Sequence, residues 1–99
     1  MKLQTQSIRF DADQKLLDYL QKKCDKLDHF FDNIIDGQVY LRLEKEGSPS
    51  LKSVDIKINV PQQELIASEK AYTFEEAIDL ATDNLKRQIK KYKERLRAY

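Results

Sequence analysis

The sequence predicts an α+β fold in which two helices pack on one face of a four-stranded sheet, in the order βαβββα. Two segments, about 14–31 and from 73 almost to the end of the chain, carry apolar residues at the spacing of an amphipathic helix. Between them, two segments alternate apolar and polar residues, which indicates strands with one buried face, and a short segment after them is expected to form a third consecutive strand. Two helices on one face of such a sheet bury all of these stripes together. With 99 residues, the chain is long enough for one domain with one core.

The N-terminal part of the chain predicts a strand followed by a helix. Leu3 and Thr5 alternate with polar neighbours and indicate a short first strand at a sheet edge. Asp13 is suited to cap the N-terminus of a helix over about 14–31. The buried stripe of this helix is expected to consist of Leu16, Leu20, Cys24, Leu27 and Phe31.

Three strands are expected in the middle of the chain. Alternation over 39–44 predicts the first, a turn at 47–50 follows, and alternation over 54–60 predicts its hairpin partner. After a turn at 61–63, residues 65–68 are expected to form the third strand. The positions expected on the inner face are Val39, Leu41, Leu43, Val54, Ile56, Ile58 and Val60. The positions of the hairpin partner expected to face solvent are Asp55, Lys57 and Asn59.

A second helix is expected to occupy the last quarter of the chain. Thr73 and Glu76 have the spacing of a capping box, in which each side chain satisfies a backbone amide of the other residue. The apolar stripe that follows persists almost to the C-terminus, so this end is predicted to be an ordered helix. The stripe consists of Phe74, Ala77, Ile78, Ala81, Leu85, Ile89, Tyr92 and Leu96.

The charge of the chain is concentrated at this helical end. Residues 86–97 hold seven bases and one acid, whereas the whole chain holds 18 bases and 17 acids, so the remainder has 11 bases and 16 acids. Clustered Lys and Arg indicate a polyanionic partner, because their binding to phosphates releases condensed counterions, which favours association. Complementing the helix macrodipole would need only one or two bases. A nucleic-acid surface is therefore the favoured interpretation.

The helical period places these bases along two flanks of the second helix. Lys86, Lys90, Lys93 and Arg97 form one stripe beside the apolar face, and Arg87 and Lys91 lie on the opposite flank with Arg95. On the first helix, Lys22 and Lys26 share one side with Lys15, and Lys23 lies nearer the core. Helices packed side by side would border a shared groove that could hold a phosphate backbone. A solvent-exposed face of i,i+4 ion pairs explains the lysines of the first helix equally well. It does not explain the bases of the second helix, which have almost no acidic residues near them.

The sequence offers little for other chemistry. With one His, one Cys and two Gly, neither a metal site nor a phosphate-binding glycine loop is expected, and no cofactor is implied. Cys24 is predicted to face the core and His29 to face outward, which is a poor geometry for a Cys–His nucleophile, and no enzyme is expected. The longest apolar runs are too short to span a membrane, and a lone cysteine suits the cytoplasm. Tyr92 is expected in the core, while the role of Tyr40 on the outer sheet face stays open.

Several segments in this order resemble the short-form ribosome hibernation promoting factors, a family that includes the ribosome-associated inhibitor and is sometimes labelled sigma-factor modulation proteins. The similarity extends over essentially the whole chain. The most specific segments are 26–34 (KLDHFFDNI), 39–41 (VYL), 43–45 (LEK), 67–68 (AS), 77–79 (AID) and 85–93 (LKRQIKKYK).

The resemblance implies a fold similar to a double-stranded-RNA-binding domain. It also implies binding to the small ribosomal subunit between head and body, across the tRNA and mRNA sites, under stress or in stationary phase. The family's basic positions fall on Lys23, Lys26, Lys86, Arg87, Lys90, Lys91 and Lys93. The chain stops at Tyr99 without the long form's ribosome-pairing domain or the inhibitor's acidic tail, so the short hibernation-promoting branch is the expectation. In that branch ribosome pairing requires a separate ribosome modulation factor.

The expected activity is therefore translation inhibition by occlusion of the small subunit, with no membrane or small-molecule substrate as partner. Two other interpretations stay open at this point. The chain could be a general double-stranded-RNA-binding module, or a protein-interaction module for an acidic protein surface.

Overall fold

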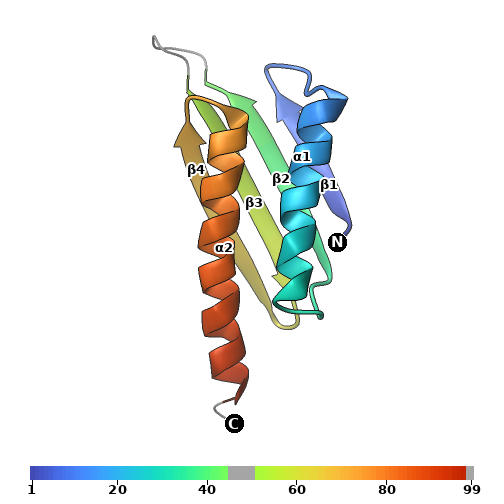
Figure 1. The fold of residues 1–99 in the computed structure, drawn as a ribbon, viewed down its shortest axis with the longest axis vertical. Coiled ribbons are helices and arrows are strands. Elements are labelled where there is room, and N and C mark those ends of the chain that lie inside the picture. The colour runs from blue at the N-terminus through green and yellow to red at the C-terminus, as the bar shows by residue number, and fades with distance from the viewer. Residues whose placement is uncertain (45–50, 98–99) are drawn as a thin grey trace.

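The computed structural model describes residues 1–44 and 51–97, and it contains the predicted order of elements (Figure 1). A short 3₁₀ helix, η1, directly follows the first α-helix. The elements are β1 (Leu3–Ile8), α1 (Gln14–Asp25), η1 (Lys26–His29), β2 (Asp36–Leu43), β3 (Lys52–Val60), β4 (Gln63–Ala71) and α2 (Phe74–Arg97). The turn predicted at 47–50 and the terminal Tyr99 lie outside the described residues.

The sheet is mixed, with the strand order β1-β2-β3-β4. β2, β3 and β4 are antiparallel neighbours, as predicted, with Ile56 opposite Val39 on one side and Ala67 on the other. β1 is an edge strand that pairs with β2 in parallel. The parallel pairing follows from the connection, because α1 carries the chain back across the sheet before β2 begins. β4 is longer than the predicted 65–68, since its pairing with β3 continues to Ala71.

Both helices cover the same face of the sheet, and the core lies between these two layers (Figure 1). Ile56 and Ile58 are completely buried on the inner face, which confirms the predicted register. Asp55, Lys57 and Asn59 lie on the open face and are half-buried, since neighbouring strands cover part of each side chain. Leu43 is also only half-buried, because it lies at the end of β2. The alternation of the strands therefore assigns one face to the core and one to solvent.

The predicted first helix begins as expected but ends early. The Asp13 side chain accepts a hydrogen bond from the Leu16 amide at 2.8 Å, so the predicted N-cap is confirmed. The prediction of one helix to Phe31 is wrong, because α1 ends at Asp25 and the chain tightens into η1. The tighter turn closes with a 3.0 Å hydrogen bond from the Phe30 amide to the Leu27 carbonyl. Leu27 stays buried, and the chain then turns toward β2.

The second helix begins at its predicted cap and extends past the sheet. The Thr73 hydroxyl accepts a hydrogen bond from the Glu76 amide at 3.1 Å, which is one half of the expected capping box. Tyr92 is buried, and its hydroxyl donates to the Pro61 carbonyl at 2.9 Å in the β3–β4 turn. Leu96 is 52% exposed, so its predicted place in the buried stripe is wrong. Figure 1 shows why, because the last turns of α2 extend beyond the ends of the strands.

Candidate nucleic-acid interface

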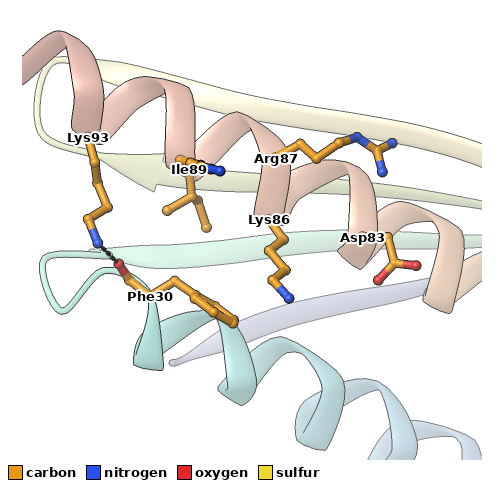
Figure 2. A pocket seen from close by; sticks show the side chains of 7 residues that line it. Phe30, Asp83, Lys86, Arg87, Ile89 and Lys93 are labelled. Atoms are coloured by element: carbon orange, nitrogen blue, oxygen red, sulfur yellow. Dashed lines mark hydrogen bonds between the residues drawn. The ribbon is translucent and has the colours of Figure 1, made fainter.

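A groove between the two helical segments collects most of the predicted basic residues. One cavity of about 480 Å³ is lined by Phe30, Asp83, Lys86, Arg87, Ile89, Lys90 and Lys93 (Figure 2). A second, of about 350 Å³, is lined by Lys23, Lys26, Leu27, His29, Phe30, Thr82, Asp83 and Lys86. Because Phe30, Asp83 and Lys86 line both cavities, the two form one continuous surface, which we call the interhelical groove. Six of its residues are Lys or Arg and one is acidic.

The groove is basic because the apolar face of α2 packs on the sheet and leaves a basic flank of the helix toward the groove. Leu85 and Ile89 are completely buried against the sheet, which leaves the flanking positions of the helix toward η1 or solvent. Lys86 and Lys93 extend from this flank toward Phe30, whereas Arg87 points away from it (Figure 2). The predicted two-walled groove is thus present, with Lys23 and Lys26 on the wall formed by α1 and η1.

A polar cluster joins the two helices at one end of the groove. The Tyr19 hydroxyl donates to Asp79 Oδ1 at 2.5 Å, and Lys23 Nζ lies 3.2 Å from the same oxygen. The hydrogen bond to Asp79 is the main reason that the pKa of Tyr19 is raised to about 12. Burial would raise the pKa of Asp79, but hydrogen bonds from Tyr19 and Lys23 outweigh it and hold the pKa below the usual value. The cluster connects α1 to α2, and the ion pair with Asp79 neutralises part of the positive charge of Lys23.

Two lysines of α2 also hold the opposite wall. Lys93 Nζ donates to the Phe30 carbonyl oxygen at 2.7 Å, the contact drawn in Figure 2. Lys86 Nζ lies 4.7 Å from the centroid of the Phe30 ring, a cation–π contact. The next residue, Phe31, packs edge-on against Tyr92 with ring centroids 5.2 Å apart. Each ammonium has three donors, so both lysines keep donors for an anionic ligand.

Three of the predicted binding residues lie outside the groove. Lys22 is exposed on α1, and Lys91 and Arg97 are exposed on α2, but none of the three lines either cavity. These three residues therefore do not form the walls of the groove. Contact between RNA and any of the nine basic residues stays a prediction.

Sequence reasoning did not assign Phe30, Asp79, Asp83 or Thr82 to the site. Asp79 and Asp83 occupy the same flank of α2 as Lys86, two turns and one turn earlier, so the helical period could have placed them there. For Phe30 the signal was weaker. Of the adjacent residues Phe30 and Phe31, only one can face the core. Which one does so depends on where α1 ends, and the sequence does not show that.

Cys24 and His29 occupy the predicted positions. Cys24 is completely buried in the core, and this burial raises the pKa of its thiol to about 12. A thiol with such a pKa is a poor nucleophile near neutral pH. His29 is exposed at the end of η1. Across residues 1–44 and 51–97, no group of acidic, His and Cys side chains is arranged to hold a metal ion.

The described part of the chain contains no helix that is both long and apolar enough to cross a membrane. The architecture is that of a small α+β domain with a basic helical layer on one face of a mixed sheet. Residues 3–97 match the model of the family described as Sigma 54 modulation protein / S30EA ribosomal protein, and the chain belongs to this family.

Individual relatives agree with this assignment. The chain is 32% identical over 85 residues to the ribosome hibernation promoting factor of Pseudomonas putida, covering 86% of this chain and 79% of the relative. It is 30% identical to the ribosome hibernation promotion factor of Deinococcus radiodurans, covering 86% of this chain but only 45% of that longer protein.

Solved structures show the same fold. The N-terminal domain of Thermus thermophilus Protein Y superposes with a TM-score of 0.82 at 25% identity, covering 93% of this chain and 99% of that domain. A Coxiella burnetii structure described as a ribosomal subunit interface protein also gives 0.82, at 22% identity, covering 95% of this chain and 99% of that one. The likeness to a double-stranded-RNA-binding domain stays a prediction.

Proposed function

We propose that this protein is a non-enzymatic ribosome hibernation factor, which binds the small ribosomal subunit across the tRNA and mRNA sites and inhibits translation by occlusion. The observation that carries the proposal is the interhelical groove, in which six basic side chains and one carboxylate line a continuous surface. Membership of the family and the names of the relatives supply the ribosome as the partner. Such an activity takes place in the cytoplasm, under stress or in stationary phase.

The mechanism follows from the chemistry of the groove. Lys and Arg side chains bind phosphates without reading sequence, so they position the protein on folded ribosomal RNA. Specificity for the ribosome then comes from RNA shape, because side chains cannot read the deep, narrow major groove of A-form RNA. The domain itself acts as a plug that excludes tRNA and mRNA.

Competition with tRNA and mRNA tests this occlusion. Labelled protein is added to purified small subunits that are either empty or already filled with a short mRNA and its cognate tRNA. Empty subunits should bind the protein, and filled subunits should bind far less. Equal binding to both would contradict occlusion of these sites.

Two further measurements separate the proposal from its rivals. Affinity for naked duplex RNA that equals the affinity for small subunits would favour a general RNA-binding module. Nuclease-insensitive co-purification with an acidic, non-ribosomal protein would favour a protein-interaction module. The basic groove is consistent with both, so the ribosomal proposal depends on the family relationship as well as on the charge.

A further inference from the structure

One aromatic ring lies in the groove and is not part of the apolar core. Phe30 is 39% exposed, and it lines both cavities between the helical segments. The core beneath it is complete without its side chain, since Leu27 and Ile89 are buried. A single exposed aromatic residue is common on protein surfaces. Phe30 differs because it lies in a cavity whose other lining side chains are charged, except for Ile89.

The backbone of Phe30 is held at both ends of the residue. Its amide donates to the Leu27 carbonyl at 3.0 Å, and its carbonyl accepts from Lys93 Nζ at 2.7 Å. The neighbouring Phe31 is fixed by its contact with Tyr92. The ring therefore stands on an ordered turn. Such a platform can stack a planar ligand with little loss of conformational freedom.

The polar side chains around the ring define what the planar ligand must offer. Among the seven residues that line the larger cavity, Asp83 is the only hydrogen-bond acceptor side chain. Lys86, Lys90 and Lys93 are donors only. A ligand with two adjacent N–H donors on one edge and acceptors on another satisfies both kinds of group. Guanine has this pattern, with N1–H and N2–H₂ on one edge and O6 and N7 on another.

We propose that the groove contains a guanine pocket, in which one unstacked guanine of the bound RNA stacks on Phe30 and donates to the carboxylate of Asp83. The proposal rests on the RNA-binding function proposed above and adds to it a single base that is recognised. The lysines would contact O6, N7 or the phosphates of the same strand. Uracil, which offers one ring N–H between two carbonyls, fits Asp83 less well.

Lys86 must leave the ring when the base enters. Its ammonium lies 4.7 Å above the centroid of Phe30, where the base would stack. An exposed cation–π contact is weaker than base–aromatic stacking, and a lysine side chain is flexible enough to turn toward a phosphate. In the free protein, Lys86 thus covers a surface that RNA would occupy. The exchange keeps the charge of Lys86 within the groove.

Short single-stranded RNAs test the pocket directly. The probes are three fluorescent uridine oligonucleotides of about six residues, a length within the range of single-strand sites. One has a central guanosine, one a central inosine, which lacks the 2-amino group, and one uridine only. Wild-type protein should bind the guanosine probe about tenfold more tightly than the uridine probe, with inosine between them. Equal binding of all three probes would overturn the proposal.

Three variants connect this preference to the two side chains. Phe30→Leu should lower affinity for the guanosine probe by about 5- to 150-fold, the effect of losing one base–aromatic stack, and Phe30→Trp should retain it. Tyr72→Leu is the matched control, since Tyr72 is also an exposed aromatic residue but precedes α2, away from the groove. Asp83→Asn should abolish the preference for guanosine yet strengthen binding of the uridine probe, because a repulsive charge is removed. An Asp83→Asn protein that still prefers guanosine would contradict the assigned contact.

Two further results distinguish a guanine pocket for RNA from a site for free nucleotides and from a groove that binds phosphates alone. Free GMP should compete only weakly, since it lacks the neighbouring phosphates, and GMP that binds more tightly than the guanosine probe would show a nucleotide site instead of an RNA site. If Phe30→Leu binds small subunits like wild type while charge reversal in the groove abolishes binding, the pocket is wrong and the proposed function stands. If wild type prefers guanosine but does not bind small subunits, the proposed function fails instead.

Discussion

The salt dependence of ribosome binding should report how many groove side chains contact phosphates. Six basic side chains line the groove, and two of them already have an internal ion pair or hydrogen bond, Lys23 with Asp79 and Lys93 with the Phe30 carbonyl. We therefore expect between about four and six phosphate contacts, each of which contributes about 0.7 to 0.9 to the slope of log K against log salt. The slope should lie between about −3 and −5. Affinity should fall by about 60- to 1,000-fold when salt rises from about 50 to 200 mM.

Replacing Lys90 with Gln removes one contact from this set. Lys90 is exposed, lines the larger cavity and has no internal hydrogen bond or ion pair among the described residues, so its loss should leave the fold intact. The slope should become shallower by about 0.7 to 0.9, which makes the affinity ratio of wild type to variant about threefold larger at 50 than at 200 mM salt. Fluorescence anisotropy of labelled protein with purified small subunits measures both quantities.

Lys70→Gln is the matched control for this experiment. Lys70 lies in β4, where alternation places it on the open face of the sheet, and its change in charge is the same. The control should have the wild-type slope. The reasoning would be refuted if Lys90→Gln had the same slope of log K against log salt as wild type. It would also be refuted if Lys70→Gln changed this slope as much as Lys90→Gln does.

Three other predictions concern stability and the second wall of the groove. Cys24→Ala should cost about 1 kcal/mol in the free energy of unfolding, as a small truncation in the core, and leave ribosome binding unchanged; lost binding by a folded variant would contradict a structural role. The pKa of Asp79 is lowered in the folded protein, so its contribution to stability is present above about pH 4 and is lost as pH falls through the folded pKa. Asp79→Asn should therefore have a lower Tm than wild type at pH 7, and thermal melts should show this difference in Tm becoming smaller in acid. A difference in Tm that does not change with pH would contradict the stabilising role of the Asp79 carboxylate. Changing Lys22 and Lys26 together to Glu should weaken binding to small subunits in the anisotropy assay, mainly through Lys26, because only Lys26 lines the groove; wild-type affinity would mean that α2 acts alone.

The sequence could predict most of the fold because each strand and helix begins with a local signal. Alternation identified the inner faces of the strands, and the side chains of Asp13 and Thr73 identified both helix starts. The end of α1 had no such signal. Leu27 is buried in either an α or a 3₁₀ turn, so the apolar spacing does not distinguish them. The spacing of apolar residues along α2 also does not show where the sheet ends, and for this reason the sequence predicts Leu96 in the core.

The groove was predictable in outline because charge clusters and helical periods are both visible in a sequence. Its internal contacts were not. Tyr19 and Asp79 are 60 residues apart, and Lys93 is 63 residues from the carbonyl of Phe30 that it contacts. Such pairs depend on how closely two helices approach, which no local pattern encodes. For the same reason Asp83 and Phe30, the residues of the proposed guanine pocket, had no assigned role before the structure placed them together.

Co-sedimentation of a charge-reversed groove with small ribosomal subunits tests the central claim most directly. Lys86, Lys90 and Lys93 are changed together to Glu, and the control changes Arg42, Lys57 and Lys70, which alternation places on the open sheet face. Circular dichroism and thermal melts establish that both proteins are folded. The account predicts that the control sediments with small subunits like wild type, while the groove variant stays at the top of the gradient. A folded groove variant that still sediments with small subunits would contradict it.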